Sequence, residues 1–142
     1  MRRNRSLFFL VLRILLVPIE ISSFLKENTM FNETVLVFSR NGMGSGPAEL
    51  QQRLAAKFLA LTLESGDLPA KILFYTEGVR LVCSGSMVID PLMQMEQRGV
   101  ELVICSTCLE FLGVQNEVKV GVVGGMGDIL TAMQMAEKVV SI

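Results

Sequence analysis

The strongest constraint on the fold of this chain is an alternation of two sequence patterns between residues 34 and 139. Short, continuously apolar runs rich in β-branched residues predict strands that are buried on both faces. Between them lie segments with apolar residues every three to four positions, which predict helices that cover the sheet. A strand–helix repeat of this kind predicts a parallel sheet, because each helix returns the chain to the same edge. We therefore predict an α/β fold, a small doubly wound parallel sheet with helices on both faces. The predicted strands are residues 34–39, 70–76, 100–105 and 117–123, and the predicted helices are residues 47–64, 86–98, 106–112 and 128–139.

The first 29 residues differ in composition from the rest of the chain. They hold five of the 13 basic residues and two of the 14 acidic ones, which leaves residues 30–142 with a net charge of −4. The apolar run at residues 7–17 contains Arg13 and is too short to span a bilayer. We predict a domain over residues 30–142, with residues 1–29 an apolar and basic segment outside it, either an upstream start or a tail. The alternatives are an added helix packed on the domain or on a partner, and an export or membrane signal.

Histidine is absent from the 142 residues, and this absence excludes several classes of function. Ser-His and Cys-His nucleophile pairs need an imidazole base, and a zinc site needs more ligands than three cysteines supply. The chain has no basic stripe, which argues against nucleic-acid binding. We therefore expect no metal, no cofactor, no nucleic acid and no membrane role. Three cysteines fit a reducing compartment rather than a disulfide framework, so we expect a cytoplasmic protein.

The run Cys105-Ser106-Thr107-Cys108 is the main candidate for chemistry. Cys105 ends a predicted buried strand, and Cys108 falls in the first turn of the helix predicted after it. A helix start offers free amide donors and a partial positive charge, which favour the thiolate, the reactive form of cysteine. Two thiols three residues apart can also close a disulfide, so that one can displace what the other carries. The alternative is that both are small buried hydrophobic residues.

Two known uses of such cysteines do not fit this sequence. Thioredoxin-like domains place a cis-proline on a later strand, whereas Pro91 is the last proline of this chain. Phosphatase and rhodanese-like loops need a basic residue close behind their cysteine, whereas the next one after Cys108 is Lys119. We therefore interpret the pair as a thiol site of another kind.

Glycine-rich turns follow the first and the last predicted strands. In the first turn, backbone amides between strand and helix can hold a small anion. The alternative is a tight turn that needs glycine for its positive φ, and the pattern departs from the dinucleotide and P-loop fingerprints. The second turn, residues 124–127, is similar, and Asp128 is expected to be the N-cap of the last helix. The candidate anion-binding residues of the first turn are Asn41, Gly42, Gly44, Ser45 and Gly46.

Two more residues are candidates for the same edge of the sheet, because loops that follow parallel strands meet there. Cys83, after the second predicted strand, is a candidate third thiol, although a core role is the simpler interpretation. Glu110 follows the thiol pair and is a candidate acid that tunes it, or else an ordinary solvent-exposed helix residue.

Three stretches of the sequence resemble the DsrE-type domain of YedF-like proteins, which are sulfurtransferase-like and linked to selenium metabolism. They are residues 41–46, residues 77–86, and residues 99–102 with the run from Cys105 to Gly113. The resemblance covers most of residues 34–125. It implies a DsrE-like parallel α/β fold, homo-oligomers such as trimers or hexamers, and a cysteine that carries persulfide sulfur at the position of Cys105. YedF-like proteins usually carry a TusA-like domain ahead of this one, where this chain has 29 unrelated residues. A separate sulfur donor or acceptor protein, such as a TusA-like one, is therefore implied.

The sequence thus predicts a sulfur-relay protein, a sulfurtransferase-like persulfide carrier that accepts and passes sulfane sulfur or selenium on a cysteine. In this hypothesis Cys105 takes the sulfur as a persulfide and passes it to an acceptor thiol, while the amides of residues 40–46 stabilise the sulfur anion. Alternatively, Cys108 attacks the Cys105 persulfide, which releases sulfide and leaves a Cys105–Cys108 disulfide. Two alternatives stay open. One is a non-enzymatic oligomeric subunit that binds a small anion or nucleotide at the glycine-rich edge, and the other is a thiol redox sensor.

Overall fold

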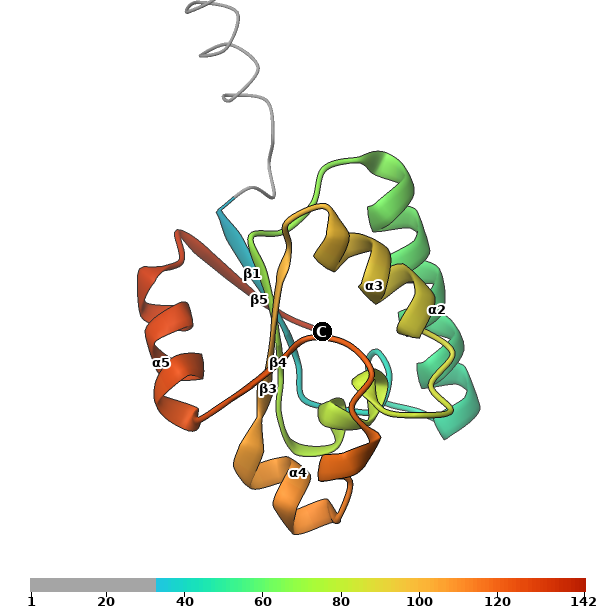
Figure 1. The fold of residues 1–142 in the computed structure, drawn as a ribbon. Coiled ribbons are helices and arrows are strands. Elements are labelled where there is room, and N and C mark those ends of the chain that lie inside the picture. Colours follow the sequence, from blue (N-terminus) through green and yellow to red (C-terminus); the bar gives the residue numbers. More distant parts are fainter. Residues whose placement is uncertain (1–32) are drawn as a thin grey trace, which may run out of the picture. The chain divides into compact units, whose positions relative to one another are not determined.

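The structure, a computed structural model, describes residues 33–142 and contains a five-stranded parallel sheet (Figure 1). The sheet order is β4-β3-β2-β1-β5, and every neighbouring pair is parallel. The interpretation of residues 1–29 lies outside the described residues. The strands are β1 (Thr34–Phe38), β2 (Lys71–Phe74), β3 (Glu101–Cys105), β4 (Val122–Gly124) and β5 (Lys138–Ser141).

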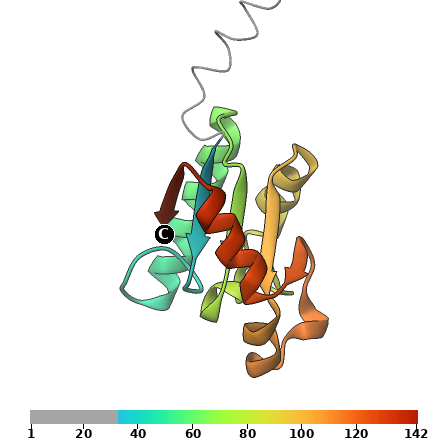
Figure 2. The ribbon, with the colours of Figure 1, turned by 90° about the vertical axis from the view of Figure 1, so that its left-hand side faces the viewer.

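Helices cover both faces of this sheet. Helices α2 (Ala48–Ser65) and α3 (Ile89–Gln97) lie on one face and α5 (Met126–Met135) lies on the other, as Figure 1 and the turned view in Figure 2 show. Helix α4 (Ser106–Leu112) lies beyond the end of β3 and packs against the 3-10 helix η1 (Thr76–Val82). The predicted doubly wound α/β fold is therefore confirmed. A second short 3-10 helix, η2 (Gln115–Glu117), follows α4.

The core explains why the central strands read as continuous apolar runs. All five residues of β1 are buried, and β2 and β3 are buried at every position after the first. Phe38 and Phe74 are paired at the ends of β1 and β2, and their rings stack with centroids 5.8 Å apart. Because helices cover both faces, neither face of these strands needs polar residues.

The C-terminal region differs from the prediction of one long helix over residues 128–139. Helix α5 begins at Met126, with Gly125 as its N-cap, and ends at Met135. Asp128 is not the N-cap, because its carboxylate accepts a hydrogen bond of 2.7 Å from the N–H of Gly125. Strand β5 then pairs with β1 at the edge of the sheet. Sequence patterns missed β5 because it is short and mostly exposed, so it has no continuous apolar run.

The strand predicted over residues 117–123 is also shorter than expected. Val118 forms an isolated antiparallel bridge with Cys83, and the N–H of Lys119 donates to the carbonyl of Val82 at 2.9 Å. These residues therefore satisfy backbone groups at the end of η1, at Val82 and Cys83, rather than those of the sheet. Residues 77–85, for which neither a strand nor a helix was predicted, contain most of η1.

Gly78 in η1 provides a test of how closely this segment packs on β1. A Cβ atom at this position would overlap the carbonyl group of Phe38. We expect Gly78→Ala to lower the free energy of unfolding by about 2–3 kcal/mol, as measured by urea denaturation. Gly127→Ala is the matched control, because a Cβ there meets no atom within 4 Å and alanine favours the helix. Equal stability of the Gly78→Ala variant and the unaltered protein would contradict the close packing.

Candidate functional site

The turns that follow the first three strands all lie along one edge of the sheet. This C-terminal edge is marked by the last residues of β1, β2 and β3, which are Phe38, Phe74 and Cys105. The glycine turn follows β1, η1 begins two residues after β2, and α4 follows β3 directly. The parallel topology therefore places these loops side by side, as predicted.

Cys105 and Cys108 lie on either side of the turn from β3 into α4. Cys105 is the last residue of β3, and Cys108 is the third residue of α4. Both are free thiols, but the side chain of Cys105 has no exposed surface while that of Cys108 is partly exposed. The two thiols lie within hydrogen-bonding reach of each other. Solvent therefore reaches this pair through Cys108.

A backbone amide from η1 points at the exposed thiol. The N–H of Thr76 donates to Cys108 Sγ, with a nitrogen–sulfur distance of 3.0 Å. Thr76 has a φ of +47°, the one positive φ at a non-glycine residue within residues 33–142. This backbone conformation costs about 1–3 kcal/mol, so the surroundings must hold it in place. Sequence reasoning missed Thr76, because nothing in its local sequence marks a strained backbone.

The pKa of the Cys108 thiol is raised above its ordinary value. Burial is the largest cause, and the hydrogen bond with the Cys105 thiol is the second. The N–H of Thr76 lowers the pKa, but it does not offset the other two effects. Cys108 is therefore protonated at neutral pH, although its place at the start of a helix predicted that the thiolate would be favoured.

Glu110, the predicted tuning acid, lies two residues after Cys108 and is exposed. The pKa of Cys108 responds to burial, to Cys105 and to Thr76, and the Glu110 carboxylate is not among these causes. A tuning role for Glu110 stays a prediction.

The glycine turn is closed by contacts with its own helix. The N–H of Met43 donates to the carbonyl of Gln51 at 2.9 Å, and the Gln51 side chain donates to the carbonyl of Gly46 at 2.5 Å. Gly42 packs so tightly that a Cβ there would come within 2.5 Å of Gln51. Gly42 and Gly44 both have positive φ. These contacts give the glycines a structural explanation, and anion binding by this turn stays a prediction.

Cys83 lies at a separate small cavity of about 210 Å³. It is buried, and its thiol donates to the carbonyl of Val79 at 3.2 Å. Burial and the nearby carboxylate of Glu117 raise its pKa, against a smaller opposing effect of Arg80. The cavity brings Cys83 together with Asn41, whereas Cys105 and Cys108 are not among the described residues that line it. A third thiol at the Cys105–Cys108 pair stays a prediction that no contact supports.

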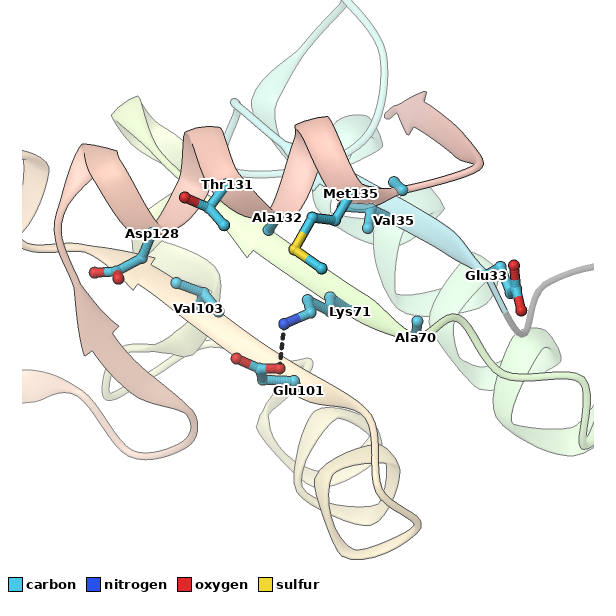
Figure 3. Close-up of a pocket in the computed structure, with 11 residues that line it drawn as sticks. Glu33, Val35, Ala70, Lys71, Glu101, Val103, Asp128, Thr131, Ala132 and Met135 are labelled. Atoms are coloured by element: carbon cyan, nitrogen blue, oxygen red, sulfur yellow. Dashed lines mark hydrogen bonds and ion pairs between the residues drawn. The ribbon is translucent and has the colours of Figure 1, made fainter.

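A larger cavity, of about 520 Å³, opens between α5 and the sheet (Figure 3). Its walls include the apolar side chains of Val35, Val103 and Met135. An ion pair of 2.5 Å joins Lys71 Nζ to Glu101 Oε2 on the sheet side. None of the three cysteines is among its described lining residues, so this cavity is distinct from the candidate site.

Two further features of residues 33–142 concern metal ions and membranes. This part of the chain contains no group of three or more His, Cys, Asp or Glu side chains that could hold a metal ion. It also contains no helix that is long and apolar enough to cross a membrane. The reactive groups gathered at the candidate site are thus two thiols, with one backbone amide beside them.

These features define a class of protein, a small parallel α/β domain with cysteine at the C-terminal edge of its sheet. Within that class, the chain belongs to the DsrE/DsrF-like family, whose model matches residues 41–142. The match confirms the resemblance to DsrE-type domains and the expected DsrE-like fold. The family is generally related to sulfur relay, which agrees with the predicted area of function.

Solved structures share the fold of this chain. The YchN protein from E. coli is 17% identical, with a TM-score of 0.57, and the match covers 80% of this chain and all of that one. BT1422 from Bacteroides thetaiotaomicron, a conserved protein of unknown function, is 21% identical with a TM-score of 0.56 over 78% of this chain and 95% of that one. MTH1491 from Methanobacterium thermoautotrophicum, also of unknown function, is 17% identical with a TM-score of 0.56 over 77% and 97%. No curated protein matches the chain.

The causes of the raised Cys108 pKa predict how its reactivity depends on pH. Because the thiolate is the reactive form, alkylation of Cys108 should keep accelerating as the pH approaches 9. Cys105→Ala removes the neighbouring thiol, so the pKa of Cys108 should fall and alkylation near neutral pH should become severalfold faster. Iodoacetamide labelling followed by peptide mass spectrometry measures both. Cys105→Ser keeps a hydrogen-bonding side chain and should change the rate less, and an unchanged pKa in the Cys105→Ala variant would contradict the assigned cause.

Proposed function

We propose that this protein is a persulfide carrier of a sulfur relay, and that the Cys105–Cys108 pair takes up and passes on sulfane sulfur or selenium. One observation carries the proposal: a partly exposed thiol and a fully buried thiol are in contact at the C-terminal edge of the sheet. Such a pair can take sulfur at the surface and keep it away from solvent. Family membership supports the same kind of chemistry.

In the proposed reaction, sulfur enters the pair at Cys108. The Cys108 thiolate attacks the terminal sulfur of a donor persulfide, and a new S–S bond forms on Cys108 as the S–S bond of the donor breaks. The donor departs as a thiolate with the bonding electron pair, so no outside oxidant or reductant is needed. Cys108 is the first acceptor in this proposal because Cys105 has no surface that a donor can reach.

Sulfur then passes between the two thiols of the pair. The Cys105 thiolate attacks the terminal sulfur of the Cys108 persulfide, which gives a Cys105 persulfide and a free Cys108 thiolate. This step places the sulfur on Cys105, the position at which the family resemblance predicts the carrier. If Cys105 instead attacks the inner sulfur, the products are a Cys105–Cys108 disulfide and hydrogen sulfide. The first route keeps the sulfur for transfer, and the second releases it as sulfide and leaves the pair oxidised.

The proposal is tested by intact-mass spectrometry of the reduced protein after exposure to a persulfide donor. We expect the unaltered protein to gain one sulfur atom, Cys105→Ser to gain one on Cys108, and Cys108→Ser to gain none at a comparable rate. Cys83→Ser is the matched control and should load like the unaltered protein, because Cys83 lies at a different cavity.

Other outcomes would change the assignment. Loading that needs Cys105 but not Cys108 would mean that sulfur arrives directly at Cys105. A folded protein with an alkylatable Cys108 that gains no sulfur would overturn the carrier function and favour the binding subunit. A Cys105–Cys108 disulfide that forms under mild oxidant, without sulfur transfer, would favour the sensor.

The proposal also includes partners, namely a separate sulfur donor or acceptor protein, such as a TusA-like one, and further copies of this chain in a homo-oligomer. Phe111 supports a protein partner, because its side chain is 89% exposed one helical turn beyond Cys108 on α4. Exposed aromatic residues of this kind often anchor protein contacts. Val122, Val123, Met126 and Leu130 form a second exposed apolar group along β4 and α5, which copies of the chain would cover.

Phe111→Ala separates docking of a protein from the chemistry of the thiols. We expect the variant to exchange sulfur with a partner protein about tenfold or more slowly, the usual effect of removing an aromatic anchor. Loading by a small persulfide should be unchanged, because Phe111 is not among the groups that set the pKa of Cys108. Met135→Ala is the control, because Met135 is also an exposed apolar residue but is the last residue of α5, a different helix from the one that carries Phe111. Equal loss with both kinds of donor would mean that Phe111 does not act through docking.

A further inference from the structure

We propose that the backbone N–H of Thr76 is an anion-stabilising group of the thiol site, and that the strained backbone at this residue serves to aim the N–H at Cys108 Sγ. The inference deepens the proposed function, on which it rests for the identity of the reaction. Its geometry can be tested without any sulfur transfer.

Several contacts hold Thr76 in its strained conformation. The hydroxyl of Thr76 donates to the carbonyl of Ser39, just after β1, and the N–H of Tyr75 donates to the carbonyl of Phe38 at 3.2 Å. Gly78 packs directly against that same residue, Phe38. Contacts with Phe38 and Ser39 at the end of β1 therefore fix this conformation. The Thr76 N–H that it directs lies 3.0 Å from Cys108 Sγ.

The acceptor of this hydrogen bond is unusual for a purely structural contact. A thiol sulfur is a weak acceptor, whereas a backbone carbonyl would satisfy the same N–H far better. A strained residue is thus paired with a weak partner in the resting protein. The pairing becomes strong only when the sulfur carries negative charge, as it does when Cys108 attacks a donor and when it leaves the persulfide. An interaction that strengthens along the reaction is what catalysis requires.

Among the groups around Cys108, a backbone N–H is the one that stabilises the thiolate. Burial and the Cys105 thiol both favour the protonated sulfur, and the Thr76 amide is the one described group that favours the anion. Glu77 and Arg80, the charged residues of η1, are paired with each other at 2.6 Å. We therefore assign the stabilisation of the Cys108 anion to the Thr76 N–H.

An amide-to-ester replacement at Thr76 in the full chain removes this N–H and keeps the side chain. In a Cys105→Ser background, the pKa of Cys108 is measured from the pH dependence of iodoacetamide labelling. We expect the ester to raise this pKa by about one to two units, the effect of losing a hydrogen bond to a charged group. The pKa of Cys83, which donates to Val79 instead, serves as the internal reference and should not move. An unchanged Cys108 pKa in a folded ester protein would overturn the inference.

A second measurement applies even if the ester protein does not fold. In the protein with its natural backbone, the Thr76 amide proton should shift in NMR spectra with the same midpoint as Cys108 ionisation, and Cys108→Ser should abolish the shift. An amide that does not respond while Cys108 ionises would overturn the inference.

The two proposals fail separately. A Thr76 effect on the Cys108 pKa without any sulfur loading would keep this inference and overturn the carrier function. Sulfur loading at Cys108 without an effect of Thr76 on the Cys108 pKa would keep the carrier function and overturn this inference.

Discussion

The close approach of η1 to the end of β1 is the contact on which the candidate site depends. Gly78 lets the backbone of η1 lie against Phe38 where no side chain would fit. The other end of this segment is fixed by the bridge between Cys83 and Val118. Held at both ends, η1 packs against α4, and the Thr76 amide meets Cys108 there. The geometry of the thiols thus follows from backbone packing two strands away.

That packing determines how far the surroundings of Cys108 favour the neutral thiol over the thiolate. Burial and the Cys105 thiol favour the neutral form, and their combined effect exceeds that of the Thr76 amide. A thiol kept neutral in this way is poorly reactive toward random oxidants. Its reaction with a docked donor would draw on the amide as charge develops. The same arrangement that keeps Cys108 poorly reactive in the free protein can therefore favour its reaction with a docked donor.

Sequence patterns predicted the parts of the fold that are buried on both faces. Strands β1 and β3 stand out because their apolar runs are continuous, and α4 was predicted with its observed bounds because Gly113 ends it in the left-handed conformation. The edges of the sheet could not be predicted equally well. Strands β4 and β5 are short and partly exposed, so their sequences carry little of the core pattern.

At the site, the sequence predicted the side chains better than the backbone geometry. The spacing of Cys105 and Cys108 was visible in the sequence, but their difference in exposure depends on how α4 packs on η1. The role of Thr76 was not visible at all, because a backbone N–H is present at almost every residue and only the fold decides where it points. In a chain without histidine, stabilisation of a sulfur anion by side chains would need lysine or arginine, and neither is among the groups that set the Cys108 pKa. Backbone geometry, which a sequence pattern does not encode directly, therefore carries the chemistry that side chains supply at many other thiol sites.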